Sequence, residues 1–297
     1  MKRKWLYFIL LIVILLAIFL GLVFFFNKSN DSSQYNDGFR AHRMIAHAMG
    51  GISGKAYTNS YESFIANYEK GLRVFEADFL LSADNDLIAR HEWGESFTKL
   101  MGQEDGLKPE RYGAIFTTKE FKDAKIMGRY EPLTWDDVLD LMVDYPDMYL
   151  VTDTKQIKPE EIEQIFSKIV DGAKQRDPEI LARIVPQIYN HPMWDQIEAI
   201  YPFESVIFTL YQTHESDDEV LQFAREKGLA AITMSEARAN KSLVSELNKL
   251  GIPSYVHTIN DVEKMQKFRN MGVYGFYTDS LTEEDGNRSW WRNYLGL

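Results

Sequence analysis

The chain has 297 residues, of which 45% are hydrophobic, 26% are charged and none is cysteine, and its formal net charge is −11. This is the composition of a globular protein long enough to bury a large core. The lack of cysteine excludes a disulfide scaffold and a cysteine-ligated zinc site. The negative charge argues against a nucleic-acid partner, and an anionic ligand would need local positive charge or a bound cation.

The first 27 residues differ from the rest of the chain. The basic start MKRK precedes an apolar run from Trp5 to Phe26, which as a helix of about 22 residues would span roughly 33 Å. A cleaved signal peptide is the alternative, but the run exceeds the ~7–15 residues of a signal core and no small-residue cleavage pattern follows it. We therefore predict a single-pass anchor in residues 1–27 with a cytoplasmic N-terminus, a flexible stalk in 28–39, and an extracytoplasmic domain in 40–297.

From residue 40 onward, short β-type runs alternate with segments of helical periodicity. Strands that repeatedly follow helices must lie parallel, so we predict an α/β fold, a closed (β/α)8 TIM barrel. An open doubly wound sheet is the alternative, but no Gly-x-Gly-x-x-Gly follows the first strand to support its dinucleotide-binding form. The eight runs are 43–48, 72–78, 148–153, 183–188, 205–210, 230–234, 253–258 and 274–279.

Two features stand out between these strands. Thr134 and Asp137 in TWDDVLDLM predict a capping box at a helix start. The segment 92–131 is long, polar and weakly patterned, which is typical of a loop that covers a binding site. We interpret it as a candidate substrate-covering insertion, with simple decoration as the alternative.

Two acids interrupt the second apolar run. Glu76 and Asp78 are two residues apart on a strand, so they project from the same face with Cα atoms roughly 6.5–7 Å apart. As unpaired charges they would repel by roughly 2–3 kcal/mol at an effective dielectric constant of ~20. Salt bridges to basic residues or solvent exposure could relieve this repulsion, and so could a bound cation.

A histidine returns to these acids through a predicted hairpin. The stretch SADNDL is a turn signal, and a two-residue turn at Asp84-Asn85 would place His91 directly opposite Asp78. The neighbouring strand ends supply Asp153, Lys155 and His47, and strand ends are where such a barrel keeps its active site.

Three carboxylates without nitrogen or sulfur ligands suit Mg²⁺ or Ca²⁺ better than zinc. Two histidines beside such an ion could act as general acid and general base. We interpret the remaining histidines His42, His191 and His214 as structural.

These motifs resemble the glycerophosphodiester phosphodiesterase family, within the superfamily of barrel enzymes that includes phosphatidylinositol-specific phospholipase C. The likeness runs in order along the chain through IAHAMGG, TNSYESF, the Glu-x-Asp pair with RHE, TDTK, PLTWDDVL, HTIN and GVYGFYTD. It covers about residues 43–280.

The resemblance implies a set of site residues. It makes Glu76, Asp78 and Asp153 ligands of one divalent cation, His47 and His91 the acid–base pair, and Lys155 and Asn59 contacts to phosphate or substrate. This sequence departs from the family pattern in having Ala48 for an arginine, Thr58 for a glutamate, Asp153 for a glutamate and His257 for a tryptophan. The lost arginine would have been a bidentate phosphate clamp. We expect His257 either to be a polar contact in the pocket or to pack in place of the aromatic side chain.

The expected function is that of a membrane-anchored, metal-dependent phosphodiesterase acting on a phosphodiester substrate, with no nucleic-acid partner. Its location favours lipid head groups or glycerophosphate-containing surface polymers as substrates. One alternative is a phospholipase C- or D-like activity on intact lipid, helped by Trp290 and Trp291 at the membrane interface. The other is an inactive barrel that serves as a scaffold module.

Overall fold

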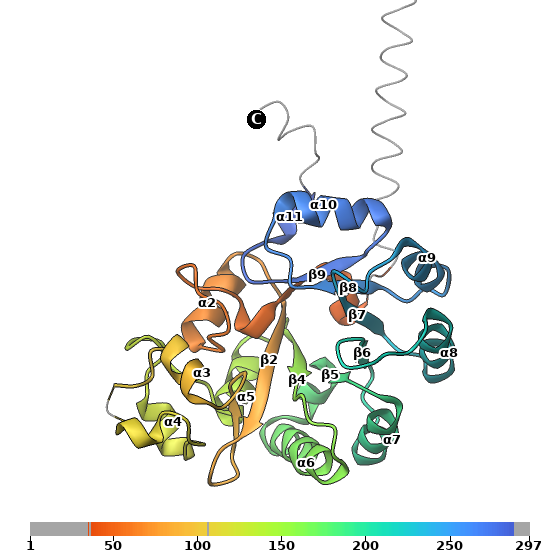
Figure 1. Cartoon of the computed structure of the whole chain (residues 1–297). Helices are drawn as coiled ribbons and strands as arrows, with labels where there is room; N and C mark the ends of the chain where they lie inside the picture. The colour runs from red at the N-terminus through yellow and green to blue at the C-terminus, as the bar shows by residue number, and fades with distance from the viewer. Residues whose placement is uncertain (1–34, 36, 106, 288–297) are drawn as a thin grey trace, which may run out of the picture. The chain divides into compact units, whose positions relative to one another are not determined.

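Eight parallel strands close into a barrel, as the sequence predicts (Figure 1). The computed structural model describes residues 35, 37–105 and 107–287. Neighbouring strands pair in the order β1-β9-β8-β7-β6-β5-β4-β2, and β1 pairs with β2 to close the ring. The strands are β1 Met44–Ala46, β2 Val74–Leu81, β4 Tyr149–Asp153, β5 Ile184–Ile188, β6 Ile207–Thr209, β7 Ala231–Ser235, β8 Ser254–His257 and β9 Gly275–Thr278.

An outer ring of helices covers the barrel (Figure 1). Their inward faces and the outward faces of the strands form one large hydrophobic core. The predicted capping box begins α5, because Thr134 Oγ1 accepts from the amide of Asp137 and the Asp137 carboxylate accepts from the amide of Thr134. The helices are α2 Tyr61–Glu69, α5 Trp135–Asp144, α6 Pro159–Arg176, α7 His191–Ile200, α8 Asp217–Lys227, α9 Lys241–Lys249, α10 Val262–Met271 and α11 Glu283–Asn287, with 3₁₀ segments η1 Gly38–Ala41, η2 His47–Met49 and η4 Pro178–Arg183.

The hairpin that follows β2 forms with a different register. The strand β3, Leu87–Ala89, runs antiparallel to β2 and pairs Phe79 with Ala89. The predicted two-residue turn is wrong: the amide of Asp86 donates to the Ser82 side chain at 2.9 Å, which holds a longer loop. As a result, Arg90 and not His91 lies across from Asp78, with its amide bonded to the Asp78 carbonyl at 2.8 Å.

The segment 92–131 folds into short helices beside the barrel: α3 Glu95–Leu100, η3 Pro109–Arg111 and α4 Thr118–Asp123. Among the described residues, this segment supplies most of two small hydrophobic clusters that are separate from the main core. The buried guanidinium of Arg90 ties it to the hairpin by bonding the carbonyl of Glu92 and the side chains of Thr98 and Gln103.

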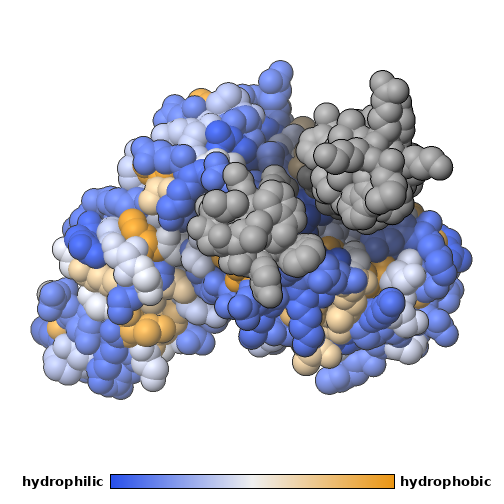
Figure 2. All heavy atoms as spheres, turned by 90° about the horizontal axis from the view of Figure 1, so that it is seen from above, coloured by the Kyte–Doolittle hydropathy of each residue, from blue (hydrophilic) through white to orange (hydrophobic). Residues whose placement is uncertain are grey.

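The predicted anchor in 1–27 and the pair Trp290 and Trp291 lie outside the described residues. Within the part that is described, no helix has both the length and the apolar character needed to cross a bilayer. The compact unit begins at Gly38, inside the predicted stalk 28–39. Figure 2 shows a mostly hydrophilic face on which apolar residues lie in separate small groups.

Candidate active site

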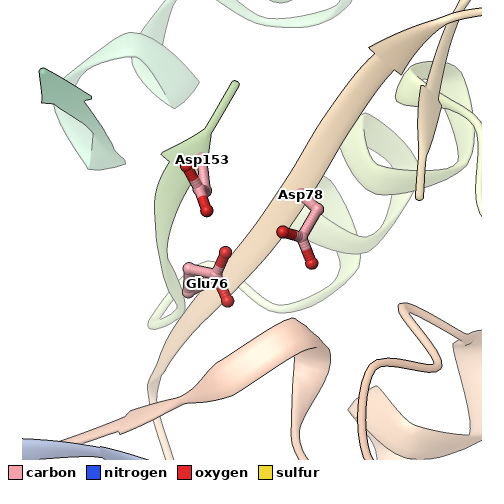
Figure 3. A group of neighbouring side chains, drawn as sticks. All are labelled: Glu76, Asp78 and Asp153. Carbon is pink, nitrogen blue, oxygen red and sulfur yellow. The ribbon is translucent and has the colours of Figure 1, made fainter. Parts of the chain in front are cut away.

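Three carboxylates converge at the carboxyl ends of two neighbouring strands. Glu76 and Asp78 lie on β2 and Asp153 ends β4, and the parallel register pairs Asp78 directly with Asp153. One oxygen from each carboxylate lies within 4.8 Å of the others (Figure 3). Glu76 is 2% exposed and Asp78 is 1% exposed, so water does little to weaken their repulsion.

One ammonium group partly offsets this charge. Lys155 Nζ is bonded to Asp78 and lies 3.3 Å from Asp153 Oδ2, while the amide of Ala48 donates to Glu76 at 2.6 Å. Burial and then the charge of Asp78 raise the pKa of Glu76 to about 8. Burial raises the pKa of Asp153 to about 6, even though Lys155 acts in the opposite direction. One cation therefore does not balance three acids.

The donor set suits a hard divalent cation. Asp153 Oδ1 is buried and has no hydrogen-bond partner among the described residues, which is costly for a carboxylate oxygen unless it binds something else. Mg²⁺ and Ca²⁺ prefer oxygen ligands of this kind. The predicted ligands Glu76, Asp78 and Asp153 thus lie together and fit such an ion.

His47 follows β1 and faces the acids with a carboxylate partner of its own. Its Nδ1 lies 2.8 Å from Asp279 Oδ1. Burial lowers its pKa, but the Asp279 hydrogen bond and the charge of Glu76 outweigh this and raise the pKa to about 9. The imidazole is therefore protonated at neutral pH and can donate a proton.

Asp279, which our sequence analysis did not assign to the site, is firmly held behind His47. Asn260 donates to Asp279 Oδ2 at 2.6 Å and accepts from the Asp279 amide at 2.7 Å. The amide of Gly51 bonds the Asp279 carbonyl at 2.7 Å, and a Cβ at Gly51 would lie 2.5 Å from that oxygen, so only glycine fits there. The motifs HTIN and GVYGFYTD end in Asn260 and Asp279, the two residues of this contact.

His91 lies on the other side of the same pocket. Its ring stacks on Phe97 of the insertion at a centroid distance of 5.6 Å. Burial is the main cause that lowers its pKa, so the ring is neutral at pH 7 and can accept a proton. Tyr57 lies next to both histidines, with its ring centroid 4.8 Å from each of theirs.

One pocket of about 370 Å³ contains these groups, a volume within the ~300–1,000 Å³ usual for small-molecule sites. Among the described residues of the insertion 92–131, only Glu92 lines this pocket. The residues of our predicted site that line it are His47, Glu76, Asp78, His91, Asp153, Lys155 and His257.

His257 is a polar wall of the pocket. It lies at the end of β8 beside Tyr211 and Tyr277, with ring centroids 6.3 and 6.2 Å away. Burial and then the charge of His47 lower its pKa to about 4, so the ring is neutral. Its Nε2 is buried and lacks a hydrogen-bond partner in the described part of the chain.

Asn59, which we predicted to contact phosphate or substrate, lies behind the acids. It is buried and is not among the pocket-lining residues. Its amide nitrogen donates to Asp78 Oδ2 at 2.9 Å, and its amide oxygen accepts from the Asp78 backbone at 3.2 Å. Asn59 therefore fixes the position of the Asp78 carboxylate. His42, His191 and His214 do not line the pocket either.

The closed barrel has a pocket that combines two histidines with an acidic cluster that could hold a metal ion, the arrangement of an enzyme active site. The sequence profile of the glycerophosphoryl diester phosphodiesterase family matches residues 51–283, and the chain belongs to this family. It is a phosphoric diester hydrolase. None of the curated proteins compared with the chain matches it.

Solved structures share the fold. A glycerophosphodiester phosphodiesterase from Parabacteroides distasonis is similar with a TM-score of 0.65 and 21% identity, over 82% of this chain and 95% of that one. A phosphodiesterase from Oleispira antarctica, solved with the product sn-glycerol-3-phosphate, is similar with a TM-score of 0.65 and 21% identity, over 80% of this chain and 93% of that one. At these identities the likeness shows the barrel fold.

Proposed function

We propose that the protein hydrolyses glycerophosphodiesters with the help of one divalent cation, Mg²⁺ or Ca²⁺, and of His47 and His91 as acid and base. The observation that carries the proposal is the acidic triad, with an Asp153 oxygen that has no hydrogen-bond partner among the described residues, in a pocket that also holds both histidines. The sn-glycerol-3-phosphate bound to the Oleispira antarctica phosphodiesterase supports this substrate class.

Glu76, Asp78 and Asp153 would hold the cation, which when bound supplies positive charge and Lewis acidity at a phosphate oxygen. The neutral His91 accepts a proton from the attacking hydroxyl, which belongs either to water or to the neighbouring position of the substrate. His47 carries the proton that the leaving alkoxide needs, and Asp279 keeps that proton on the ring. As one P–O bond forms and the other breaks, His91 thus takes up one proton and His47 gives one to the leaving group.

Lys155 binds beside the reacting group rather than transferring a proton. Burial lowers the pKa of its ammonium, but the charges of Asp78 and Asp153 outweigh this and raise it, so the ammonium stays charged and can contact a phosphate oxygen. Asn59 fixes Asp78, and His257 offers a neutral imidazole to the hydroxyl groups of the substrate.

The apolar run from Trp5 to Phe26 supports a location at the cell membrane, with the barrel outside the cytoplasm. From there the enzyme would reach lipid head groups or glycerophosphate-containing surface polymers. The location rests on the sequence alone.

A substrate panel tests the activity. The purified full chain is incubated with EDTA, Mg²⁺ or Ca²⁺, and release of glycerol phosphate or of the free head group is followed from glycerophosphodiesters and from lipid vesicles. We expect cation-dependent turnover of soluble diesters that is lost in His47→Ala and Glu76→Ala and kept in His191→Ala. Turnover of vesicles alone would show a phospholipase instead, and the absence of turnover on every diester would contradict the proposal and favour a scaffold.

A further inference from the structure

Tyr57 occupies a position that neither the acids nor the histidines explain. It lies in the loop between η2 and α2 and lines the pocket. Its ring meets that of His47 at an interplanar angle of 80° and that of His91 at 67°, so it contacts both rings in edge-to-face geometry. A single side chain therefore touches the two proposed proton-transfer groups at once.

The backbone at Tyr57 is in an unusual conformation. Its φ of +62° lies in the left-handed region that favours glycine, and Ser53 and Asn59 in the same loop share it, with φ of +50° and +44°. Such conformations persist where surrounding contacts fix them, and they gather at functional sites. Here Asn59 is bonded to Asp78, which fixes the loop close to the acids.

The other neighbours of Tyr57 hold its ring in place. The ring packs against the insertion cluster of Phe97, Met101, Ile126 and Tyr130. Phe97 also stacks on His91, so the insertion supports the tyrosine and one histidine together. The side chain is thus positioned before any substrate arrives, which is what a group that stabilises a transition state requires.

The hydroxyl of Tyr57 is available as a donor. It makes no hydrogen bond to any described residue, although it lies within electrostatic range of Asp279, Asp78, Lys155 and Glu76. Burial, together with the charges of Asp279 and Asp78, raises the pKa of the phenol, so it stays protonated at neutral pH. A half-buried phenol in a charged pocket is suited to donate to an anionic ligand.

We propose that Tyr57 is a further catalytic residue: its hydroxyl donates a hydrogen bond to a non-bridging oxygen of the phosphoryl group while its ring keeps His47 and His91 apart. This inference rests on the proposed phosphodiesterase function. The phenol keeps its proton throughout, so the proton balance between the two histidines is unchanged. The bond strengthens as negative charge develops on that oxygen, and it therefore acts mainly on kcat.

The test separates the hydroxyl from the ring. Tyr57→Phe removes the hydroxyl alone, Tyr57→Leu removes the ring as well, and Tyr68→Phe is the matched control because its hydroxyl bonds the exposed Asp147 at 2.6 Å, away from the pocket. Steady-state kinetics of the full chain on a glycerophosphodiester should give a kcat about 10–100-fold lower for Tyr57→Phe, with KM within about threefold. A kcat within about twofold of the wild type would overturn the inference, even if Tyr57→Leu were inactive.

Orthovanadate, which imitates the reacting phosphoryl group, gives a readout that needs no turnover. We expect Tyr57→Phe to bind it about tenfold more weakly than the wild type by calorimetry with saturating cation, and equal affinity would overturn the inference. Diester cleavage that survives in Tyr57→Phe would leave the proposed function standing and remove only the role of Tyr57. A wild type that neither cleaves diesters nor binds vanadate would overturn both.

Discussion

Glu76→Gln should stabilise the cation-free protein. Oxygens of the three carboxylates lie within 4.8 Å of one another, and at that separation two charges repel by about 3 kcal/mol at an effective dielectric constant of ~20. Glutamine has nearly the same shape, and its amide oxygen can still accept the amide hydrogen bond of Ala48. The figure is for one pair of charges: the second carboxylate adds to the repulsion, and Lys155 offsets part of it.

The stability that Glu76→Gln gains over the wild type should increase with pH. The pKa of Glu76 is raised from 4.5 to about 8 by burial and then by Asp78. Between about pH 4.5 and 8, Glu76 is therefore protonated in the folded state and ionised in the unfolded chain. The free energy of unfolding falls as the pH rises through this range. Glu76→Gln should raise the melting temperature by up to ~6–12 °C at about pH 9 in EDTA, and by much less at about pH 6.

Thermal unfolding followed by circular dichroism measures both effects, with Glu246→Gln, at a half-exposed position of α9, as a control. Mg²⁺ or Ca²⁺ at ~1,000 times its Kd should reverse the order, since such a ligand stabilises the wild type by about 4.1 kcal/mol and Glu76→Gln binds it poorly. Two results would refute the reasoning. The variant could melt below the wild type at about pH 9 in EDTA, or the cation could raise its melting temperature as much as that of the wild type.

Three further substitutions probe the groups around the acids. Asn59→Ala removes both side-chain bonds to Asp78 and should weaken cation affinity about 10–100-fold by calorimetry, whereas unchanged affinity would mean that Asp78 needs no support. Asp279→Asn removes the carboxylate that stabilises protonated His47. The pKa of His47, followed by NMR, should fall below about 9, and kcat should drop at least about tenfold. An unchanged pKa of His47 would contradict the role of Asp279. Thr134→Ala removes a helix cap and should cost about 1 kcal/mol of stability with kcat/KM unchanged, and a loss of activity at full stability would count against a purely structural role.

The barrel and the acidic triad could be predicted because both follow from local pattern and strand parity. Apolar runs alternating with helical periodicity fix parallel strands, and residues two apart on one strand share a face. Glu76 and Asp78 therefore had to point together, and Asp153 at the end of β4 had to reach the same rim.

Other features depend on contacts that no local pattern contains. The hairpin register is set by the Ser82 side chain bonding the amide of Asp86, which lengthens the turn. Asp279 reaches His47 across 232 positions of the chain, because β9 closes the barrel against β1. Tyr57 and Asn59 sit in a loop of positive φ angles, and nothing in the sequence predicts the direction in which such a loop aims its side chains.

The ion pairing of Lys155 with Asp78 and Asp153 has a consequence for the order of assembly. When all three acids are ionised, three carboxylates and one ammonium leave an excess of two negative charges, which equals the charge that a Mg²⁺ or Ca²⁺ ion would bring. The lysine gives the acids a counter-charge that does not depend on the ion, so less repulsion opposes closure of the barrel before an ion binds.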